Sequence, residues 1–376
     1  MKNKTFAYGG EGMTQREQQI LDWVTEDPMI SQEALAERAG ITRSSVAVHI
    51  SNLMKKGHIV GRGYILPAGG YVVVAGAVNV DIGGQSAGPL VGRDSNPGKV
   101  TVSMGGVGRN IAHNLRLLGV KVSLLTALGE DPHAGQVMDS CERLGIDLSR
   151  ALHVPGGTTS TYLFLSDETG DMALAVSDMG IYEELTPAYF ARHQGYLNGA
   201  ALVVADANLP AGALAYLADH CTAPLLVDPV STVKAEKVRP ILGKLHTLKP
   251  NRMEAESLSG VKITDRASAR RAAEKLLETG LERVFISLGE EGVFAADHQR
   301  DVWFPCCPAQ MHSATGAGDA FAAALGWAFL EGKDLADSAR AANAAAAIAV
   351  EGEKTINPAL SADAVQQRMQ EQEERI

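Results

Sequence analysis

Apolar positions in the first 66 residues recur at helical spacing and predict three short helices. The first helix ends at Pro28, the second spans 31–40 with Ser31 as its N-cap, and the third spans 42–57. The residues that form the apolar faces of the first and third helices are Ile20, Leu21, Val24, Val46, Ile50, Leu53 and Met54. Faces of this kind indicate a small helical domain with its own core.

Residues 58–66 alternate apolar and other residues around a Gly-Arg-Gly turn, which indicates a hairpin. Three short helices followed by a hairpin are typical of a winged helix-turn-helix, and we expect this DNA-binding domain over 13–66. The residues expected to face DNA are Thr42, Arg43, Ser44, Ser45 and His49 on the third helix, with Arg62 at the tip of the wing. The alternative is that this module binds a protein or forms a dimer surface.

Beyond a linker at 67–70, short apolar strands alternate with helices of about 10–15 residues. This alternation predicts a mostly parallel sheet covered by helices on both faces, a three-layer α/β/α fold. Two stretches, at about 82–104 and 156–177, interrupt it with strands that carry threonine and glycine. We expect these to form an antiparallel lid that stands off the main sheet.

Composition limits what the chain can be. Its 376 residues are 45% hydrophobic and 21% charged, enough for more than one domain. The net charge of −10 disfavours a main surface that meets nucleic acid, although a small basic patch fits within an acidic total. Residues 1–12 are polar and glycine-rich and are expected to be a flexible leader, and 366–376 are expected to be the end of a C-terminal helix or a tail.

Four cysteines show no CxxC spacing, so we expect free thiols in a reducing compartment. The chain shows no signal peptide and no uninterrupted apolar run near 20 residues. We therefore expect a cytoplasmic protein with no membrane partner.

Ligands of doubly wound sheets lie beyond the carboxyl ends of the strands, so the motifs that follow strands matter most. Asn79 and Asp81 close the first strand and point the same way, which suits adjacent hydroxyls of a polyol, although an Asx turn is the alternative. The segment GGVGRN at 105–110 opens a helix, and its glycines allow close approach of a ligand. It lacks the context of a dinucleotide-binding βαβ unit.

Two further motifs suit a phosphorylated nucleotide. Asn251 and Glu254, in KPNRMEAE, share the start of a helix, where one carboxylate suits the water shell of Mg²⁺. Ser287, Gly289 and Gly292, in ISLGEEGV, follow another strand and suit phosphates or ribose.

The stretch ATGAGDAF at 314–321 precedes a long alanine-rich helix. The unpaired N–H groups of Gly316, Ala317 and Gly318 would point at an anion, and Asp319 could accept the proton of an attacking hydroxyl. The alternative is an ordinary acidic residue in a first helical turn. No Walker A sequence is present, so P-loop chemistry is not indicated.

These five motifs, in this order, resemble the ribokinase-like (phosphofructokinase-B) family over about 71–365. The resemblance implies an ATP-dependent kinase with a small β lid, Asp319 as catalytic base, and residues 316–318 as an anion hole. It implies that Asn251 and Glu254 organise phosphate and Mg²⁺. By the same resemblance the acceptor sugar would contact Asn79, Asp81, Gly105, Gly106 and Asn110, and Asn343 would flank the nucleotide base.

Longer local matches at 94–99, 105–112, 154–163, 227–231 and 246–256 resemble the pseudouridine kinases of this family. That resemblance implies transfer of the ATP γ-phosphate to the 5′-hydroxyl of pseudouridine. The candidate contacts to the uracil ring are Ser95, Asn96, Ser160, Tyr162 and Asp178, for which ordinary lid structure is the alternative.

Two departures from the family pattern stand out. Ser313 lies six residues before Asp319, where the family often has Asp or Asn near a monovalent-cation site. Ser313 and Thr315 are therefore the candidate cation residues, and dependence on K⁺ stays open.

The helix-turn-helix is an addition to the compact kinases, which leaves a second hypothesis: a transcription factor whose kinase-like domain only senses a ligand. A third keeps the kinase but changes the acceptor to ribose, another nucleoside or a sugar acid. Similar kinases pair their lids, so a homodimer is expected.

Overall fold

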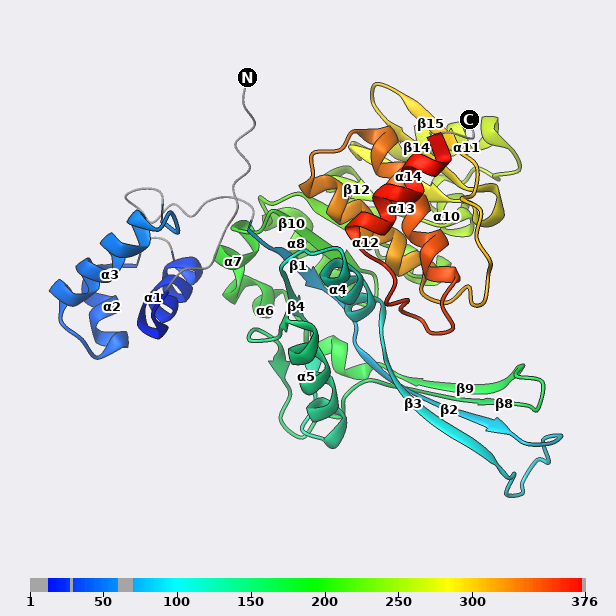
Figure 1. Ribbon diagram of the computed structural model, residues 1–376, viewed down its shortest axis with the longest axis horizontal. Coiled ribbons are helices and arrows are strands. Elements are labelled where there is room, and N and C mark those ends of the chain that lie inside the picture. The colour runs from blue at the N-terminus through cyan, green and yellow to red at the C-terminus, as the bar shows by residue number, and fades with distance from the viewer. Residues whose placement is uncertain (1–12, 28–29, 60–69, 374–376) are drawn as a thin grey trace.

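The computed structural model describes residues 13–27, 30–59 and 70–373, and it divides into a small helical unit and a larger α/β body (Figure 1). The helices of the small unit are α1 (Gln15–Glu26), α2 (Gln32–Ala39) and α3 (Arg43–Lys55). Thr14, Ser31 and Thr42 cap them by accepting a hydrogen bond from the backbone N–H three residues on. The three predicted helices are confirmed. The predicted wing with Arg62 and the leader at 1–12 lie outside the described residues, as does the linker except Gly70.

The small unit has its own core, as its apolar pattern predicts. The buried residues of this core are Ile20, Val24, Ile30, Leu35, Val46, Ile50, Leu53 and Ile59. Met54 was expected among them, but its side chain is 43% exposed. The prediction for Met54 is wrong because Leu53 already occupies the inward direction, and the next residue of a helix turns about 100° away.

The body is built on a nine-stranded sheet in the order β15-β14-β13-β12-β11-β10-β1-β4-β6. Its strands are β1 (Val72–Ala75), β4 (Val122–Leu125), β6 (Ile146–Asp147), β10 (Leu202–Asp206), β11 (Leu225–Asp228), β12 (Thr247–Leu248), β13 (Arg283–Ser287), β14 (Val293–Asp297) and β15 (Asp301–Phe304). All neighbours pair in parallel except at β14 and β15, which are antiparallel. A small two-stranded sheet pairs β5 (Ala127–Leu128) with β7 (Leu152–His153) in parallel, and these strands follow β4 and β6 along the chain.

Helices cover both faces of this sheet, because alternate strand residues point to opposite sides. Val73 belongs to the core shared with α6 (Pro187–Arg192), α7 (Gln194–Asn198), α8 (Ala211–His220), α9 (Thr232–Ala235), α10 (Arg252–Ser259) and α11 (Arg266–Leu277). Val72 and Val74 belong to the core shared with α4 (Val107–Leu117), α5 (Pro132–Leu144), α12 (Ala317–Leu330), α13 (Leu335–Val350) and α14 (Ala362–Glu373). Three 3₁₀ turns complete the body: η1 (Gly180–Glu184), η2 (Arg239–Lys244) and η3 (Gly289–Glu291). The three-layer α/β/α prediction is confirmed.

A separate four-stranded sheet projects from the body and forms the lid (Figure 1). Its strands are β2 (Asn79–Ser86), β3 (Gly98–Gly105), β8 (Thr161–Ser166) and β9 (Met172–Asp178), in the order β3-β2-β8-β9. The predicted all-antiparallel arrangement is wrong at its centre, where β2 and β8 are parallel. Both strands begin at the body, where Ser160 contacts Asn79, so they leave it in the same direction.

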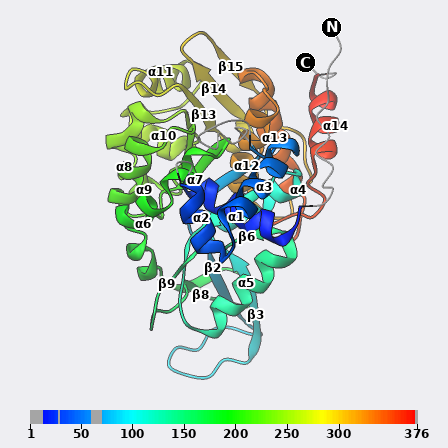
Figure 2. The same ribbon diagram turned by 90° about the vertical axis from the view of Figure 1, so that its left-hand side faces the viewer.

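The small unit rests on the body through the end of α1, which packs on α7; Figure 2 shows its helices in front of the body at this place. Gly195 of α7 makes this approach close, because a Cβ atom there would lie 2.6 Å from the carbonyl oxygen of Glu26. Across the described ranges, no helix is long and apolar enough to span a bilayer.

Candidate active site

A buried ion pair lies at the carboxyl end of the central strands. Asp228 ends β11, and Lys249 follows β12. The Lys249 Nζ donates to the Asp228 Oδ2 at 3.0 Å, and the two side chains are only 6% and 5% exposed. Sequence reasoning missed both residues as site residues, although each directly ends or follows a strand and so carries the signal used for the other motifs.

The ion pair lies beneath the start of α12. Gly316 is the N-cap of this helix with φ of 87°, and a side chain there would meet the carbonyl oxygen of Thr355. A Cβ atom on Gly318 would lie 3.1 Å from the Lys249 Nζ. The Lys249 ammonium, although paired with Asp228, and the N–H groups of the first turn therefore lie close together as donors for the oxygens of a phosphoryl group.

Asp319 lies in that first turn and faces α4. The Asn110 Nδ2 donates to the Asp319 Oδ2 at 2.8 Å. Burial, together with the charge of Asp228, raises the pKa of Asp319 to about 7, although Asn110 and Lys249 oppose the rise. A carboxylate with this pKa can accept a proton near neutral pH and release it again.

Asn110 is itself buried, and its Oδ1 has no hydrogen-bond partner within the part of the chain that the structure describes. Buried amide oxygens are nearly always satisfied. The orphaned oxygen therefore marks a place for a donor such as a ligand hydroxyl, directly beside Asp319.

The base of the lid gathers most of the residues predicted to hold the sugar. The Asn79 Oδ1 accepts from the Ser160 Oγ at 2.7 Å. Asp81 approaches Gly105 so closely that a side chain at Gly105 would meet its carboxylate. Tyr162 pairs with Asp81 across β2 and β8, which puts both on one face of the lid.

Gly106 and a buried acid fix the backbone at this base. A Cβ atom on Gly106, whose φ is 94°, would lie 2.6 Å from the Ala77 carbonyl oxygen. The Asp206 Oδ2 accepts from the Ala77 N–H at 2.8 Å. Complete burial raises the pKa of Asp206 to about 6. The turn between β1 and β2 is therefore held by the end of the neighbouring strand β10.

Three of the residues predicted to contact uracil have side chains that do not lie with Asn79, Asp81 and Tyr162 at the base of the lid. Ser95 and Asn96 lie in the loop beyond the far end of β2, roughly 23 Å from Asn79 at about 3.3 Å per residue. The Asn96 side chain bonds the backbone of Val91 instead. Asp178 pairs with Thr161, so its side chain lies on the lid face opposite to Tyr162, and its carbonyl accepts from Ser160.

A cavity of about 590 Å³ opens on the other side of α12. Its lining includes six residues predicted for nucleotide or phosphate binding, namely Ser287, Gly289, Gly292, Ala317, Gly318 and Asn343. The Asn343 Nδ2 donates to the Pro305 carbonyl at 2.7 Å, so it also holds the opposite wall. Because Gly318 lines the cavity and a Cβ atom on it would lie 3.1 Å from the Lys249 Nζ, phosphates of a nucleotide there would lie at the start of α12.

Asn251 and Glu254 form a capping box on α10, in which their side-chain oxygens accept hydrogen bonds from backbone N–H groups at the start of the helix. The Glu254 N–H donates to the Asn251 Oδ1 at 2.9 Å, and the Asn251 N–H donates to the Glu254 Oε2 at 2.8 Å. Glu254 lies close enough to Lys249 and Asp228 to share their field, and burial raises its pKa. A second lone pair on each carboxylate oxygen still suits a water of a Mg²⁺ shell, so the residues fit that ion.

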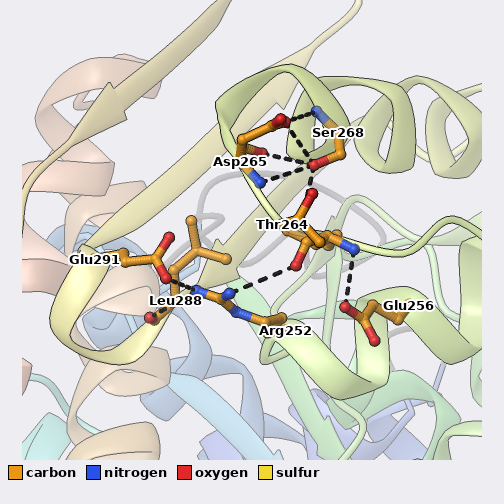
Figure 3. Close-up of polar contacts among 8 residues, drawn as sticks. Arg252, Glu256, Thr264, Asp265, Ser268, Leu288 and Glu291 are labelled. Atoms are coloured by element: carbon orange, nitrogen blue, oxygen red, sulfur yellow. Dashed lines mark hydrogen bonds and ion pairs between the residues drawn. The ribbon is translucent and has the colours of Figure 1, made fainter.

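Arg252 connects this helix to the cavity wall (Figure 3). Its guanidinium pairs with Glu291 and donates to the Leu288 carbonyl at 3.4 Å. Figure 3 also shows the start of α11, where Asp265 and Ser268 cap each other. The loop that carries Gly289 and Gly292 is therefore anchored to α10.

The two candidate cation residues lie in the loop before α12. The Ser313 N–H donates to the Val350 carbonyl at 3.2 Å, and the Thr315 N–H donates to the Ser313 Oγ at 3.3 Å. The first contact ties the loop to the end of α13, the second lies within the loop, and the cation site stays a prediction.

On α3 the residues predicted to face DNA differ in exposure. Thr42 caps the helix and contacts the hydroxyls of Ser44 and Ser45. Arg43 pairs with Glu33 at 3.0 Å, and both side chains are more than 60% exposed. Ser45 and His49 are half-buried, so Thr42, Arg43 and Ser44 form the most accessible part of the set.

A lid sheet, a carboxylate in the first turn of α12 and a cavity on the other side of that helix form the arrangement expected of a small-molecule phosphotransferase of the α/β class. Residues 70–362 match the pfkB family of carbohydrate kinases, and residues 13–60 match a winged helix-turn-helix DNA-binding family. The chain belongs to the pfkB carbohydrate kinase family.

Known relatives agree with this assignment. The chain is 40% identical over 355 residues to an uncharacterized sugar kinase, YeiI, of Escherichia coli K12, covering 93% of this chain and 98% of that one. It is 41% identical over 293 residues to the pseudouridine kinase of the same organism, covering 77% and 94%.

Solved structures agree with the fold. A putative sugar kinase from Clostridium perfringens superposes with a TM-score of 0.73 at 32% identity, covering 80% of this chain and 96% of that one. The Arabidopsis thaliana ribokinase complexed with ribose and ATP superposes with a TM-score of 0.69 at 21% identity, covering 80% and 99%.

Proposed function

We propose that this carbohydrate kinase transfers the γ-phosphoryl group of ATP to the 5′-hydroxyl of pseudouridine, with Asp319 as the catalytic base. The observation that carries the proposal is the contact between Asp319 and Asn110 at the start of α12, with Lys249 directly below. The 41% identity to a pseudouridine kinase supports the choice of acceptor.

In this mechanism the acceptor lies under the lid, held by Asn79, Asp81 and the orphaned Asn110 oxygen. Its hydroxyl oxygen attacks the γ-phosphorus as Asp319 takes the proton, and the bond to the leaving ADP oxygen breaks. The N–H groups of 316–318 and the Lys249 ammonium stabilise the charge on the transferring group. Bound Mg²⁺ would supply further neutralisation, held through water by Asn251 and Glu254.

A panel of acceptors tests the substrate. Pseudouridine, uridine, inosine, ribose and a sugar acid are offered with ATP, and ADP release and product mass are measured. We expect kcat/KM for pseudouridine to exceed the others by at least about tenfold, the net effect of about one hydrogen bond. An equal value for ribose or uridine would overturn the choice of pseudouridine and leave the kinase assignment intact. Binding of pseudouridine without ADP release would favour the ligand sensor.

The pKa of Asp319 predicts the pH dependence. The base acts only when ionised, so kcat/KM is expected to fall about tenfold per pH unit below about 7. Asn110→Ala removes a hydrogen bond that stabilises the ionised form, so the acidic limb should move to higher pH. Asn114→Ala, one turn further along α4, is the control and should leave the limb in place. A limb that does not move in Asn110→Ala contradicts this account.

We propose that the helix-turn-helix binds DNA, which the family match at 13–60 and the exposed Arg43 support. Binding should weaken steeply between about 50 and 200 mM salt, because phosphate contacts release counterions. Arg43→Ala is expected to lower the affinity for DNA several-fold. The slope of log affinity against log salt concentration should also fall by about one, the value of one lost phosphate contact. Arg16→Ala on α1 removes the same charge away from α3 and is the control. The same predictions extend to Arg62. Unchanged DNA affinity in the Arg43 and Arg62 variants would leave protein binding or a dimer surface as the role.

We propose a homodimer that pairs through the lid. One face of the lid is apolar and at least 44% exposed at Val100, Val102, Leu163, Leu165, Leu174 and Val176. Such a contiguous apolar face is typical of an interaction site. Val102→Glu should convert the dimer to monomers in light scattering, whereas Val233→Glu, on the exposed surface of α9, should not. A monomeric parent protein would contradict the proposal.

A further inference from the structure

One wall of the nucleotide cavity has no regular secondary structure of its own. Residues 305–308 follow β15, and Cys306, Cys307 and Pro308 line the cavity. Such a segment keeps its place only through contacts with its neighbours, because it has no ladder or helix to hold it. Asn343 holds its first residue by the bond to Pro305. Its other end needs a second anchor.

Arg368 of the C-terminal helix α14 supplies that anchor. Its Nη1 donates to the Pro308 carbonyl at 2.9 Å. Its Nη2 pairs with Glu351, the C-cap of α13, at 3.1 Å. The guanidinium also neighbours the Cys307 thiol, where burial raises the thiol pKa and the arginine opposes that rise. One side chain, 23% exposed, therefore joins α14 and the end of α13 to the cavity wall.

We propose that Arg368 is a positioning residue for the nucleotide, which makes α14 part of the nucleotide site although no residue of α14 lines the cavity. The inference rests on the proposed function only in taking ATP as the occupant. Without the guanidinium, the wall at 306–308 has to be ordered when the nucleotide binds, and that cost lowers affinity. None of the residues proposed to face the reacting atoms belongs to 305–308 or to α14, so the chemical step is not affected.

The test compares Arg368→Ala, Arg368→Lys and a control. In Arg368→Ala the KM for ATP is expected to rise on the order of tenfold, the loss of a charged hydrogen bond, while kcat and the acceptor KM stay within about twofold. Arg368→Lys keeps a donor for the Pro308 carbonyl and should recover part of the loss. Glu373→Gln removes another ion pair between α13 and α14, with Arg340 at 3.0 Å, and should leave the KM for ATP unchanged.

A second readout needs no acceptor. Cys306 is exposed and lines the cavity, so ATP should protect it from alkylation by iodoacetamide. In Arg368→Ala the ATP concentration that gives half protection should rise by the same factor as the KM. If Arg368→Ala does not fold, Arg368→Lys and Glu351→Gln carry the same test with smaller expected rises. An unchanged ATP requirement in the folded variants, or equal rises in both KM values, overturns the inference. If ATP protects Cys306 of the parent enzyme from alkylation but no acceptor is phosphorylated, the proposed function is contradicted and the inference about Arg368 is not.

Discussion

Replacement of Asp319 by alanine is expected to lower kcat by about 10²–10⁴-fold, the usual contribution of a positioned general base. The hydroxyl of the acceptor then has no group within reach to take its proton, although the N–H groups of 316–318 and Lys249 still bind the phosphates. The KM for ATP should change little, since the nucleotide cavity lies on the other side of α12. ADP release with pseudouridine, checked by the mass of the product, measures the effect.

Two further variants separate catalysis from helix stability. Asp319→Asn keeps the size of the side chain but cannot take the proton, so it should be as inactive as alanine. Asp363→Ala removes an exposed acid from the first turn of α14 and should keep full activity. If Asp319→Ala makes as much product as the parent protein, Asp319 is an ordinary first-turn acid and the mechanism is wrong.

The buried pair of Lys249 and Asp228 predicts the second large effect, on stability. Lys249→Met leaves the Asp228 carboxylate buried without its partner, which is expected to lower the free energy of unfolding by about 3–5 kcal/mol. Denaturant unfolding followed by tryptophan fluorescence measures the change. The double variant with Asp228→Asn should recover much of it, because asparagine is neutral and can still accept from the Val230 N–H.

An exposed ion pair serves as the control for this experiment. Lys262 pairs with Glu256 at 2.8 Å, but its side chain is 79% exposed. Lys262→Met should therefore cost no more than about 1 kcal/mol. Equal decreases in the free energy of unfolding for Lys249→Met and Lys262→Met would show that burial does not determine how much the Lys249–Asp228 pair contributes to stability.

The sequence predicts the layers of the body well because its parallel strands are short, apolar and separated by helices with clear stops. The same logic locates Asn110 and Asp319, since the carboxyl ends of neighbouring strands meet at one edge of a sheet. The prediction that Asn79 and Asp81 close the first strand is wrong, because β1 ends at Ala75 and both residues begin the lid strand β2. It misses Lys249 because a single lysine after a strand resembles any surface lysine until its partner is known. Asp228 and Lys249 become a pair only through the adjacency of β11 and β12.

The lid shows where pattern alone is insufficient. Alternation identifies its strands, but strand order depends on where each strand leaves the body, which no local pattern contains. For that reason the parallel pairing of β2 and β8 was not predicted. The family resemblance places the loop with Ser95 and Asn96 at the substrate, whereas its position at the far end of β2 depends on strand length and direction.

The position of the helix-turn-helix has a consequence for the proposed binding of DNA. It rests on α7, which precedes the strand β10, whereas the lid projects from the opposite ends of the central strands (Figure 1). A dimer that pairs through its lids would carry its two recognition helices at its outer ends. Common helix-turn-helix dimers read half-sites one helical turn apart, about 34–36 Å. A lid-paired dimer would instead suit two operators far apart on the DNA, with the intervening segment looped between them.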